Sequence, residues 1–231
     1  MNVSPIAALF DRISPKYDVL NHLLSFNRDK AWRRKTAKAV TQSQPKTILD
    51  LATGTADLAI ALAKRNPQAH IIGMDISEKM LEIGRRKVSE EGLDSQIELR
   101  YGDAASLPFG NNTFDAVTVA FGVRNFEDLD GGITEIHRVL KPSGKAFILE
   151  FSMPEKFPIK QLYRFYFKHL LPKIGKTISK DSHAYDYLPT SVERFPKPNA
   201  FLPILRQLGF AKAHAKPMTF GIVTLYTTYK N

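Results

Sequence analysis

Five short apolar runs between residues 47 and 151 alternate with segments in which hydrophobic positions repeat at helical spacing. The runs are rich in β-branched and aromatic residues, a composition typical of strands that are buried on both faces. They are Thr47–Leu51, His70–Asp75, Ile97–Arg100, Phe114–Phe121 and Lys145–Phe151. Because strands that alternate with helices build βαβ units, we predict an α/β fold with a doubly wound, mostly parallel sheet.

Two of the intervening helices have a clear apolar face. Before the fifth strand, apolar residues recur at every third or fourth position from Leu129 to Leu140, and the sequence Lys-Pro-Ser-Gly that follows predicts the end of the helix. Between the second and third strands, Ser77 is placed to cap a helix that carries Met80 and Val88 on one face. These helices have the spacing needed to cover the sheet.

The first 46 residues show no strand pattern. They predict two helices, around Tyr17–Phe26 and over Arg28–Val40, after a break at Ser14-Pro15. We therefore expect N-terminal helices that precede the sheet.

The end of the chain regains sheet character. A helix is predicted near Ala200–Leu208, followed by strands over Ala213–Lys216 and Val223–Tyr229. Their short connection favours an antiparallel hairpin at one edge, which brings the sheet to seven strands.

Between these parts, an aromatic and basic stretch over residues 157–176 and a loop-rich region to Pro198 predict a helical insertion over the cleft. Pro158 can open a helix in which Lys160, Arg164 and Lys168 lie opposite Leu162, Phe165 and Tyr166. Either the apolar stripe faces the core, or it lines a channel for an isoprenoid tail while the cations meet lipid headgroups. We expect one domain with four parts: residues 1–46, 47–151, 152–198 and 199–231.

Composition excludes several classes of protein. Hydrophobic residues at 43% and charged residues at 24% are typical of a folded globular chain. There is no apolar run of about 18 residues and no signal-peptide pattern, so we expect a soluble, cytoplasmic protein. The absence of cysteine excludes disulfides and thiolate chemistry, and six widely spaced histidines argue against a metal site.

The net charge of +10 is unevenly distributed. Residues 1–46 carry +6, residues 47–154 carry −5 and residues 155–231 carry +9. Basic arms suit an anionic partner, either nucleic acid or a lipid surface, although a high pI alone needs no such partner.

A loop of small residues follows the first strand. It runs from Ala52 through Gly54 to Ala56, and a helix begins near Asp57. Small residues there let a ligand approach the backbone at the carboxyl edge of a parallel sheet. Because Gly54 is the only glycine in the loop and no phosphate-binding lysine follows it, the sequence argues against both a dinucleotide motif and a P-loop.

Two further strand ends carry carboxylates. Asp75 ends the second strand, 21 residues after Gly54, where it can accept hydrogen bonds from both hydroxyls of a ribose. Asp103 and the adjacent backbone N–H of Ala104 follow the third strand, where they can bind an adenine edge. A nucleoside without phosphates, S-adenosyl-L-methionine (SAM), fits this set. The alternative is that Asp50, Asp75 and Asp103 only brace turns or meet solvent.

Five stretches extend the pattern: Phe10–Asp18 (FDRISPKYD), Leu49–Asp57 (LDLATGTAD), Gly102–Ala104 with Leu107–Phe109, Ala120–Asn125 (AFGVRN) and Arg138–Pro142 (RVLKP). Over nearly the whole chain they resemble the menaquinone/ubiquinone biosynthesis C-methyltransferases. Phe-Gly-Val-Arg-Asn and the N-terminal block are specific to this quinone branch. The chain departs from many relatives at Ala52 and Ala56, where they carry glycine.

The resemblance implies a class I SAM-dependent methyltransferase fold and methyl transfer to a ring carbon of demethylmenaquinol. It implies that Thr55, Asp75, Asp103 and Ala104 contact the cofactor beside Gly54, and that Arg124 and Asn125 face the substrate. In that chemistry, Arg124 would stabilise a developing phenolate and Asn125 would orient a hydroxyl or a water. Asp57 is our first candidate for the base, with alternatives in the insertion. These alternatives are His183, Tyr185 and Asp186.

Other functions remain open at this stage. A ubiquinone-precursor benzoquinol is the alternative substrate, and the basic arms with Trp32 would also suit a nucleic-acid methyltransferase. A non-catalytic protein of the same fold is the third alternative. We expect a prenylated quinol as substrate, transient contact with the anionic inner face of the membrane and no nucleic-acid partner, with a homodimer left open.

Overall fold

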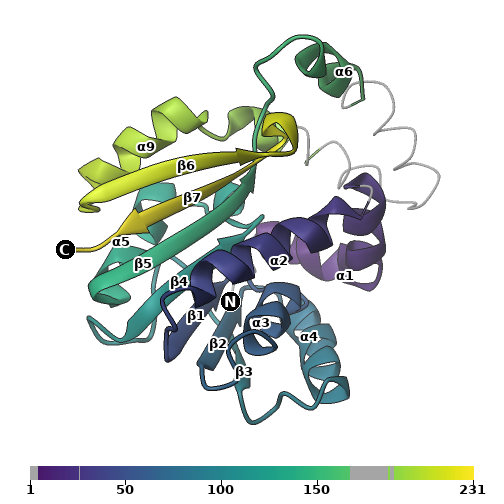
Figure 1. The fold of residues 1–231 in the computed structure, drawn as a ribbon. Helices are drawn as coiled ribbons and strands as arrows, with labels where there is room; N and C mark the ends of the chain where they lie inside the picture. The colour runs from purple at the N-terminus through teal and green to yellow at the C-terminus, as the bar shows by residue number, and fades with distance from the viewer. Residues whose placement is uncertain (1–4, 26, 167–186, 188–189) are drawn as a thin grey trace.

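The computed structural model describes residues 5–25, 27–166, 187 and 190–231, apart from the side chains of residues 15–24 (Figure 1). Seven strands form one sheet in the order β3-β2-β1-β4-β5-β7-β6. The strands are β1 Thr47–Leu51, β2 His70–Asp75, β3 Ile97–Tyr101, β4 Phe114–Ala120, β5 Leu140–Phe151, β6 Lys212–Met218 and β7 Val223–Tyr229. Neighbours among β1 to β5 are parallel, whereas β7 is antiparallel to both β5 and β6. The predicted doubly wound sheet and its edge hairpin are confirmed.

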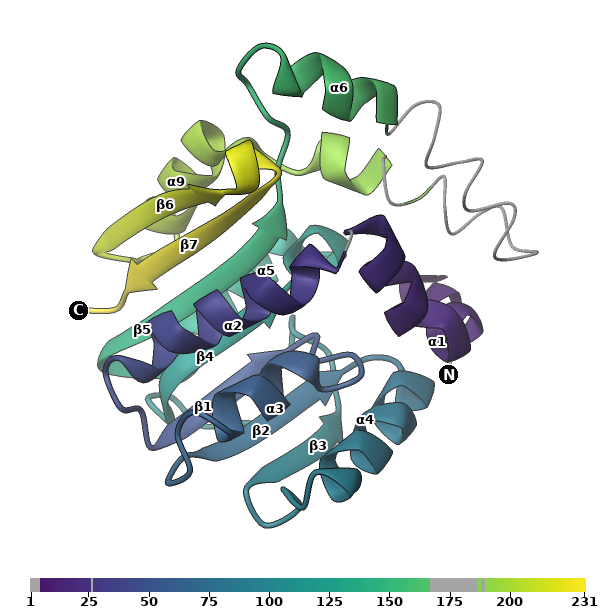
Figure 2. The ribbon, with the colours of Figure 1, turned by 45° about the vertical axis from the view of Figure 1, so that its right-hand side comes forward.

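Helices cover both faces of the sheet (Figure 2). On one face lie α2 (Arg28–Thr41), α3 (Asp57–Ala63) and α4 (Glu78–Glu90), and on the other lie α5 (Leu129–Val139) and α9 (Pro198–Gln207). Successive side chains of a strand point to opposite faces of the sheet, so Ile48 packs with α2 and α3 while Leu49 packs with α5 and α9. Because β1 to β5 run parallel, their carboxyl ends lie together along one side of the sheet.

Strand β3 departs from the predicted burial. Glu98, Arg100 and Tyr101 are exposed, although the sequence pattern predicts a strand buried on both faces. The reason is its position at the edge of the sheet, where α4 covers one face and Glu98 pairs with Arg100 at 2.6 Å on the other.

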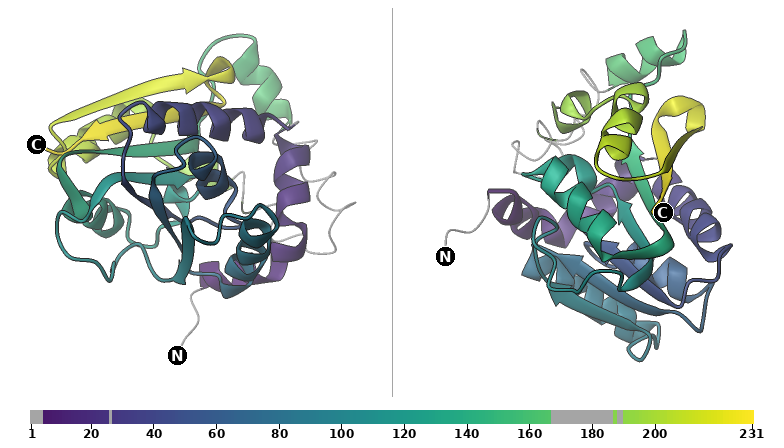
Figure 3. Two further views of the ribbon diagram at one scale, coloured as in Figure 1. Left: turned by 60° about the horizontal axis from the view of Figure 1, so that its bottom comes forward. Right: turned by 90° about the vertical axis from the view of Figure 1, so that its left-hand side faces the viewer.

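Helix α1 spans Pro5–Leu24, so the predicted break at Ser14-Pro15 is wrong. Proline has no N–H to donate to the carbonyl oxygen of Asp11, four residues earlier. The hydroxyl of Ser14 donates to that oxygen instead, at 3.0 Å. The helix therefore continues, and it lies at the edge where the parallel strands end (Figures 2 and 3).

In the insertion, α6 spans Ile159–Phe165 and follows Pro158 as predicted. Its apolar stripe does not face the core: Leu162 is 62% exposed and Phe165 is 58% exposed, while Tyr163 is buried. Tyr163 packs with Val192 against Phe151, which attaches α6 to the end of β5. The predicted residues Lys168, His183, Tyr185 and Asp186 lie outside the described residues. Within the described residues, every helix is too short or too polar to cross a membrane.

Candidate active site

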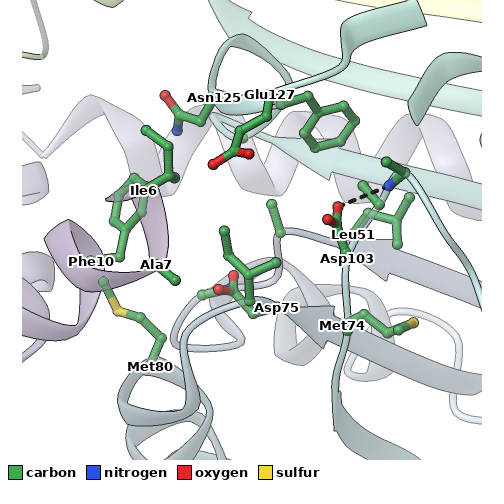
Figure 4. Close-up of a pocket in the computed structure, with 18 of the residues that line it drawn as sticks. Ile6, Ala7, Phe10, Leu51, Met74, Asp75, Met80, Asp103, Asn125 and Glu127 are labelled. Atoms are coloured by element: carbon green, nitrogen blue, oxygen red, sulfur yellow. Dashed lines mark hydrogen bonds between the residues drawn. The ribbon is translucent and has the colours of Figure 1, made fainter. Parts of the chain in front are cut away.

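A cavity of about 370 Å³ lies at the carboxyl ends of the parallel strands (Figure 4). Its wall is built by α1 and by the loops that follow β1, β2, β3 and β4. Five residues that the sequence singles out line it: Gly54, Asp75, Asp103, Ala104 and Asn125. These five of the eight predicted site residues are therefore brought together from four different strand ends.

The loop after β1 is held from beneath by Asp50. Its carboxylate accepts hydrogen bonds from the hydroxyls of Thr53, at 2.7 Å, and Thr118, at 2.5 Å. Asp50 is 1% exposed, and burial raises its pKa to about 6. It does not line the main cavity, so it has the turn-bracing role that the sequence left open.

The same loop follows a tight path. Ala52, Gly54 and Ala56 all have positive φ, at 49°, 57° and 65°. Glycine is favoured in this left-handed region, which is why alanine at two of these positions is unusual. The path brings the N–H of Gly54 to the carboxylate of Asp75, at 2.8 Å.

Asp75 joins the β1 and β2 loops at the floor of the cavity. One carboxylate oxygen accepts from Gly54, and the other accepts from the N–H of Ser77 at 2.9 Å. Burial raises the pKa of Asp75 to about 6, although these two hydrogen bonds oppose the rise. Each oxygen keeps lone-pair capacity for a ligand hydroxyl on the cavity side.

The loop after β3 is closely packed. Asp103 accepts a hydrogen bond from the N–H of Ala105 at 2.9 Å (Figure 4). A Cβ at Gly102 would overlap the terminal methyl of Met74, so the glycine permits close packing against β2. Asp103 faces the cavity from the side opposite α1, and Ala104 also lines the cavity.

The N-terminal helix supplies a wall that our sequence analysis did not assign. Ile6, Ala7 and Phe10 of α1 line the cavity opposite Asp103 (Figure 4). The hydroxyl of Ser77, which caps α4, donates to the Asp11 carboxylate of α1 at 2.5 Å. The sequence did carry a signal for this wall, because the apolar residues at positions 6, 7 and 10 share one face of a helix. The motif Phe10–Asp18 that begins there was considered only for its resemblance to the family.

Arg124 does not line the cavity, so the structure does not bring it together with the other predicted site residues, and its contact with substrate stays a prediction. Its guanidinium donates to the Glu150 carboxylate at 2.6 Å and to the carbonyl oxygen of Phe121 at 2.6 Å. The Arg124 side chain is 6% exposed and that of Glu150 is 0% exposed. A buried guanidinium requires such a partner, and the one it has comes from β5 rather than from the neighbouring Glu127 or Asp128.

Asp57 and the side chain of Thr55 lie behind the β1 loop, away from the main cavity. Asp57 pairs with Lys87 at 2.5 Å and with Arg33 at 3.7 Å, and Lys87 also donates to the hydroxyl of Thr55 at 3.1 Å. Arg33, Thr55 and Asp57 line a separate, smaller pocket behind that loop. The structure does not bring Asp57 or Thr55 to the main cavity, and their roles as the base and as a cofactor contact stay predictions.

Asn125 ends the short helix η1 (Val123–Asn125) and lines the cavity. Its side-chain oxygen accepts a hydrogen bond from the hydroxyl of Tyr187 at 2.9 Å. This bond leaves the amide N–H groups as donors on the cavity side (Figure 4). Asn125 is thus the predicted substrate residue that the structure places at the cavity.

A family model described as the ubiE/COQ5 methyltransferase family matches residues 2–230. The chain belongs to this family. The resemblance found in the sequence is confirmed, and the methyl donor of this methyltransferase is SAM.

Curated relatives match over nearly their full length. The demethylmenaquinone methyltransferase of Chlorobaculum parvum is 48% identical over 231 residues, which cover 98% of this chain and 93% of the relative. The protein of that name from Bacteroides fragilis is 45% identical over 97% of this chain and 92% of its own length. The ubiquinone/menaquinone biosynthesis C-methyltransferase UbiE of Geotalea daltonii is 42% identical, over 97% and 96%.

Solved structures of other methyltransferases share the fold. A putative SAM-dependent methyltransferase from Methanococcus maripaludis has a TM-score of 0.67 at 22% identity and covers 96% of this chain and 93% of that chain. A putative O-methyltransferase from Nostoc punctiforme has a TM-score of 0.69 at 17% identity, over 96% and 60%. With the strand order and the antiparallel β7, these similarities show the class I SAM methyltransferase fold.

The charge of the cavity in this family member fits SAM. Asp75, Asp103, Glu127 and Asp128 line it, and its wall contains no lysine, arginine or histidine among the described residues. SAM carries a sulfonium and an ammonium group and no phosphate, so an acidic wall favours it over a nucleotide.

Proposed function

We propose that this chain transfers the methyl group of SAM to a ring carbon of a prenylated demethylmenaquinol, as the last step of menaquinone biosynthesis. The observation that carries the proposal is an acidic cavity that Asn125 lines. The chain that forms this cavity is 48% identical to a demethylmenaquinone methyltransferase. The names of these relatives support the naphthoquinol ring, and the UbiE relatives support the benzoquinol as the alternative substrate.

Three strand ends would bind the cofactor. Asp75 would accept hydrogen bonds from the ribose hydroxyls, because its carboxylate lies at the floor of the cavity. Asp103 and the N–H of Ala104 would bind the adenine edge, and Gly54 would let the rest of the molecule approach the backbone. The sulfonium of bound SAM supplies an electrophilic methyl group.

Methyl transfer needs a nucleophilic ring carbon held in line with that methyl group. The ring carbon would form the new C–C bond as the C–S bond of SAM breaks with its electron pair left on sulfur, and the proton of that ring carbon would pass to water. Asn125 would donate an N–H to the quinol oxygen, because Tyr187 already occupies its carbonyl oxygen. A donor there stabilises the phenolate that forms when the quinol hydroxyl loses its proton, and the phenolate makes the ring carbon more nucleophilic.

The substrate is tested by offering the purified protein labelled SAM with demethylmenaquinol, a demethylated benzoquinol or RNA. We expect a methylated naphthoquinol by mass spectrometry and a kcat about 10²–10³ lower for Asn125→Ala, the loss typical of one preorganised donor. Methyl transfer to RNA without transfer to either quinol would refute the proposal.

We further propose that the protein visits the anionic inner face of the membrane to reach its prenylated substrate. Support comes from the side chains around α6 and the β6–β7 turn. Four of the five large hydrophobic side chains that are exposed among the described residues are Phe157, Leu162, Phe165 and Phe220. Lys156, Lys160 and Arg164 lie in the same stretch as the first three. Aromatic side chains beside cations suit a lipid interface.

Sedimentation with vesicles that contain anionic lipid tests this contact. We expect binding that falls with salt and that is weakened in a Phe157→Ser, Phe165→Ser double variant. Tyr101→Ser is the matched control, because Tyr101 is the fifth exposed side chain and lies on β3. Vesicle binding that is absent, or equal in both variants, would contradict this surface.

A further inference from the structure

A buried ion pair lies directly behind the loop that carries Asn125. Glu150, near the end of β5, is 0% exposed and accepts from the Arg124 guanidinium at 2.6 Å. Its second oxygen accepts from the Arg124 backbone N–H at 3.2 Å. The structure assigns Glu150 a positioning role: through Arg124, it holds Asn125 at the cavity wall in the geometry that methyl transfer needs. This role rests on the proposed function of Asn125.

Arg124 connects Glu150 to the backbone of the loop that carries Asn125. The Arg124 guanidinium donates to the carbonyl oxygen of Phe121, which lines the cavity and has a positive φ of 61°. A phenylalanine in this left-handed region needs surrounding contacts to keep it there. Arg124 also lies over the ring of Phe151, at 5.4 Å from its centroid.

The same guanidinium reaches the insertion. Its Nε donates to the hydroxyl of Ser191 at 3.3 Å, in a helical segment at residues 190–194. Tyr187, four residues before Ser191, donates to the side chain of Asn125. Glu150 therefore orients the Arg124 side chain. That side chain binds the carbonyl of Phe121, before Asn125, and the hydroxyl of Ser191, four residues after the tyrosine that binds the Asn125 amide.

Burying the ion pair of Arg124 and Glu150 carries a free-energy cost that the stability of the fold alone does not require. Removing two charges from water carries a penalty that apolar residues of similar size would avoid. An arginine also offers a rigid fork of donors, which here joins β5, the β4 loop and the insertion. Positioning accounts for this use of a buried charge where packing alone does not.

Glu150→Gln keeps the shape of the side chain and removes its charge. The first readout is the side-chain amide resonance of Asn125 in a ¹H–¹⁵N spectrum, identified by its loss in Asn125→Ala. We expect Glu150→Gln to shift or broaden this resonance. We also expect kcat to fall about 10- to 100-fold with little change in SAM affinity, because a displaced reacting geometry lowers turnover.

A double-mutant cycle separates positioning from general stability. If Glu150 acts through Asn125, Glu150→Gln has little further effect on kcat in the Asn125→Ala background. Equal kcat losses in both backgrounds, or an unchanged Asn125 resonance, would overturn the positioning role. A wild-type protein that methylates no quinol would refute the proposed function, and the resonance would still decide the role of Glu150.

Two more variants complete the test. Asp115→Asn breaks the pair with Lys141, which measures 2.8 Å at the opposite end of β4, and it should leave the Asn125 resonance unchanged. If Glu150→Gln does not fold, Arg124→Lys keeps the charge beside Glu150 but loses the fork, and the same two readouts apply. Failure of both variants to fold would make the pair a purely structural requirement and would overturn the proposal.

Discussion

We expect cofactor affinity to depend on Asp75. It lies in the cavity floor, and its carboxylate also anchors the backbone of Gly54 and Ser77. We expect Asp75→Ala to weaken SAM binding by about 100-fold or more, since each hydrogen bond to a charged group contributes about 1.5–3 kcal/mol. Calorimetry measures this, with the exposed Asp94→Ala as control. Unchanged SAM affinity in a folded Asp75→Ala protein would refute its role.

The buried carboxyl of Asp50 makes stability depend on pH. In the unfolded chain it loses its proton near pH 3.8, whereas burial raises its pKa to about 6 in the folded protein. The folded state therefore binds more protons between these values, and this group lowers the free energy of unfolding as pH rises from about 4 to about 6. We expect Asp50→Asn to remove that part of the decline, as measured by urea unfolding at several pH values. An identical pH profile in both proteins would contradict the assignment.

Gly122 lets two cavity loops approach each other. A Cβ there would overlap the Cβ of Ala52, in the loop after β1. We expect Gly122→Ala to lower the free energy of unfolding by about 1–3 kcal/mol through overpacking and to weaken SAM binding. Gly110→Ala is the control, because its Cβ would meet nothing closer than 3.9 Å. Equal effects from the two substitutions would argue against close loop packing.

At the level of elements, α1 closes one side of the cavity and is held to α4 by Asp11. Asp11 accepts from the hydroxyl of Ser77, which independently caps α4 by accepting from the N–H of Met80 at 3.2 Å. Asp11→Ala removes the hydrogen bond from Ser77 that ties α1 to α4 and a longer one from the N–H of Lys79, at 3.4 Å, and it leaves the Ser77 cap of α4 in place. We expect faster SAM release with a small change in Tm, because α1 is then freer to leave the cavity. Stopped-flow displacement measures the release rate.

Ser77→Ala is the comparison for this tie, since it removes both the tie and the cap. It should lower the free energy of unfolding by about 1 kcal/mol in addition to speeding release. If Asp11→Ala leaves the SAM release rate unchanged, the hydrogen bond does not hold α1 over the cofactor.

The sequence predicted well those elements that depend on a pattern within a short stretch of the chain. Five strands and their order of alternation follow from apolar runs, and the cavity residues Gly54, Asp75 and Asp103 follow because parallel strands end at one edge. The exposed face of β3 was missed, since an edge position depends on the whole sheet. So was the continuity of α1 through Pro15, where the Ser14 hydroxyl donates to the carbonyl oxygen of Asp11.

Side-chain direction in the candidate site was less predictable. Arg124 and Asp57 were assigned to the cavity from their places in the chain, yet each turns toward a partner 26 or 30 residues away. One signal for the Arg124 partner was present in the sequence. Glu150 stands in an otherwise apolar stretch of the fifth strand, and a buried carboxylate needs a cation.

At the scale of the whole molecule, an acidic cofactor cavity lies within a chain of net charge +10. The cavity suits a cationic methyl donor, while the exposed aromatic and basic side chains around α6 support our proposal of contact with a lipid surface. Both properties are expected of an enzyme that joins a water-soluble cofactor to a membrane-borne quinol.

The central claim is transfer of the SAM methyl group to a ring carbon of demethylmenaquinol. It is tested most directly by supplying SAM with a ¹³C-labelled methyl group and recording the ¹³C spectrum of the extracted quinone. We expect one new signal from a methyl group bonded to the ring carbon of the naphthoquinone, absent when Asn125→Ala replaces the wild-type protein for the same short reaction time. A signal from an oxygen-bound methyl group, or no labelled quinone at all, would contradict the claim.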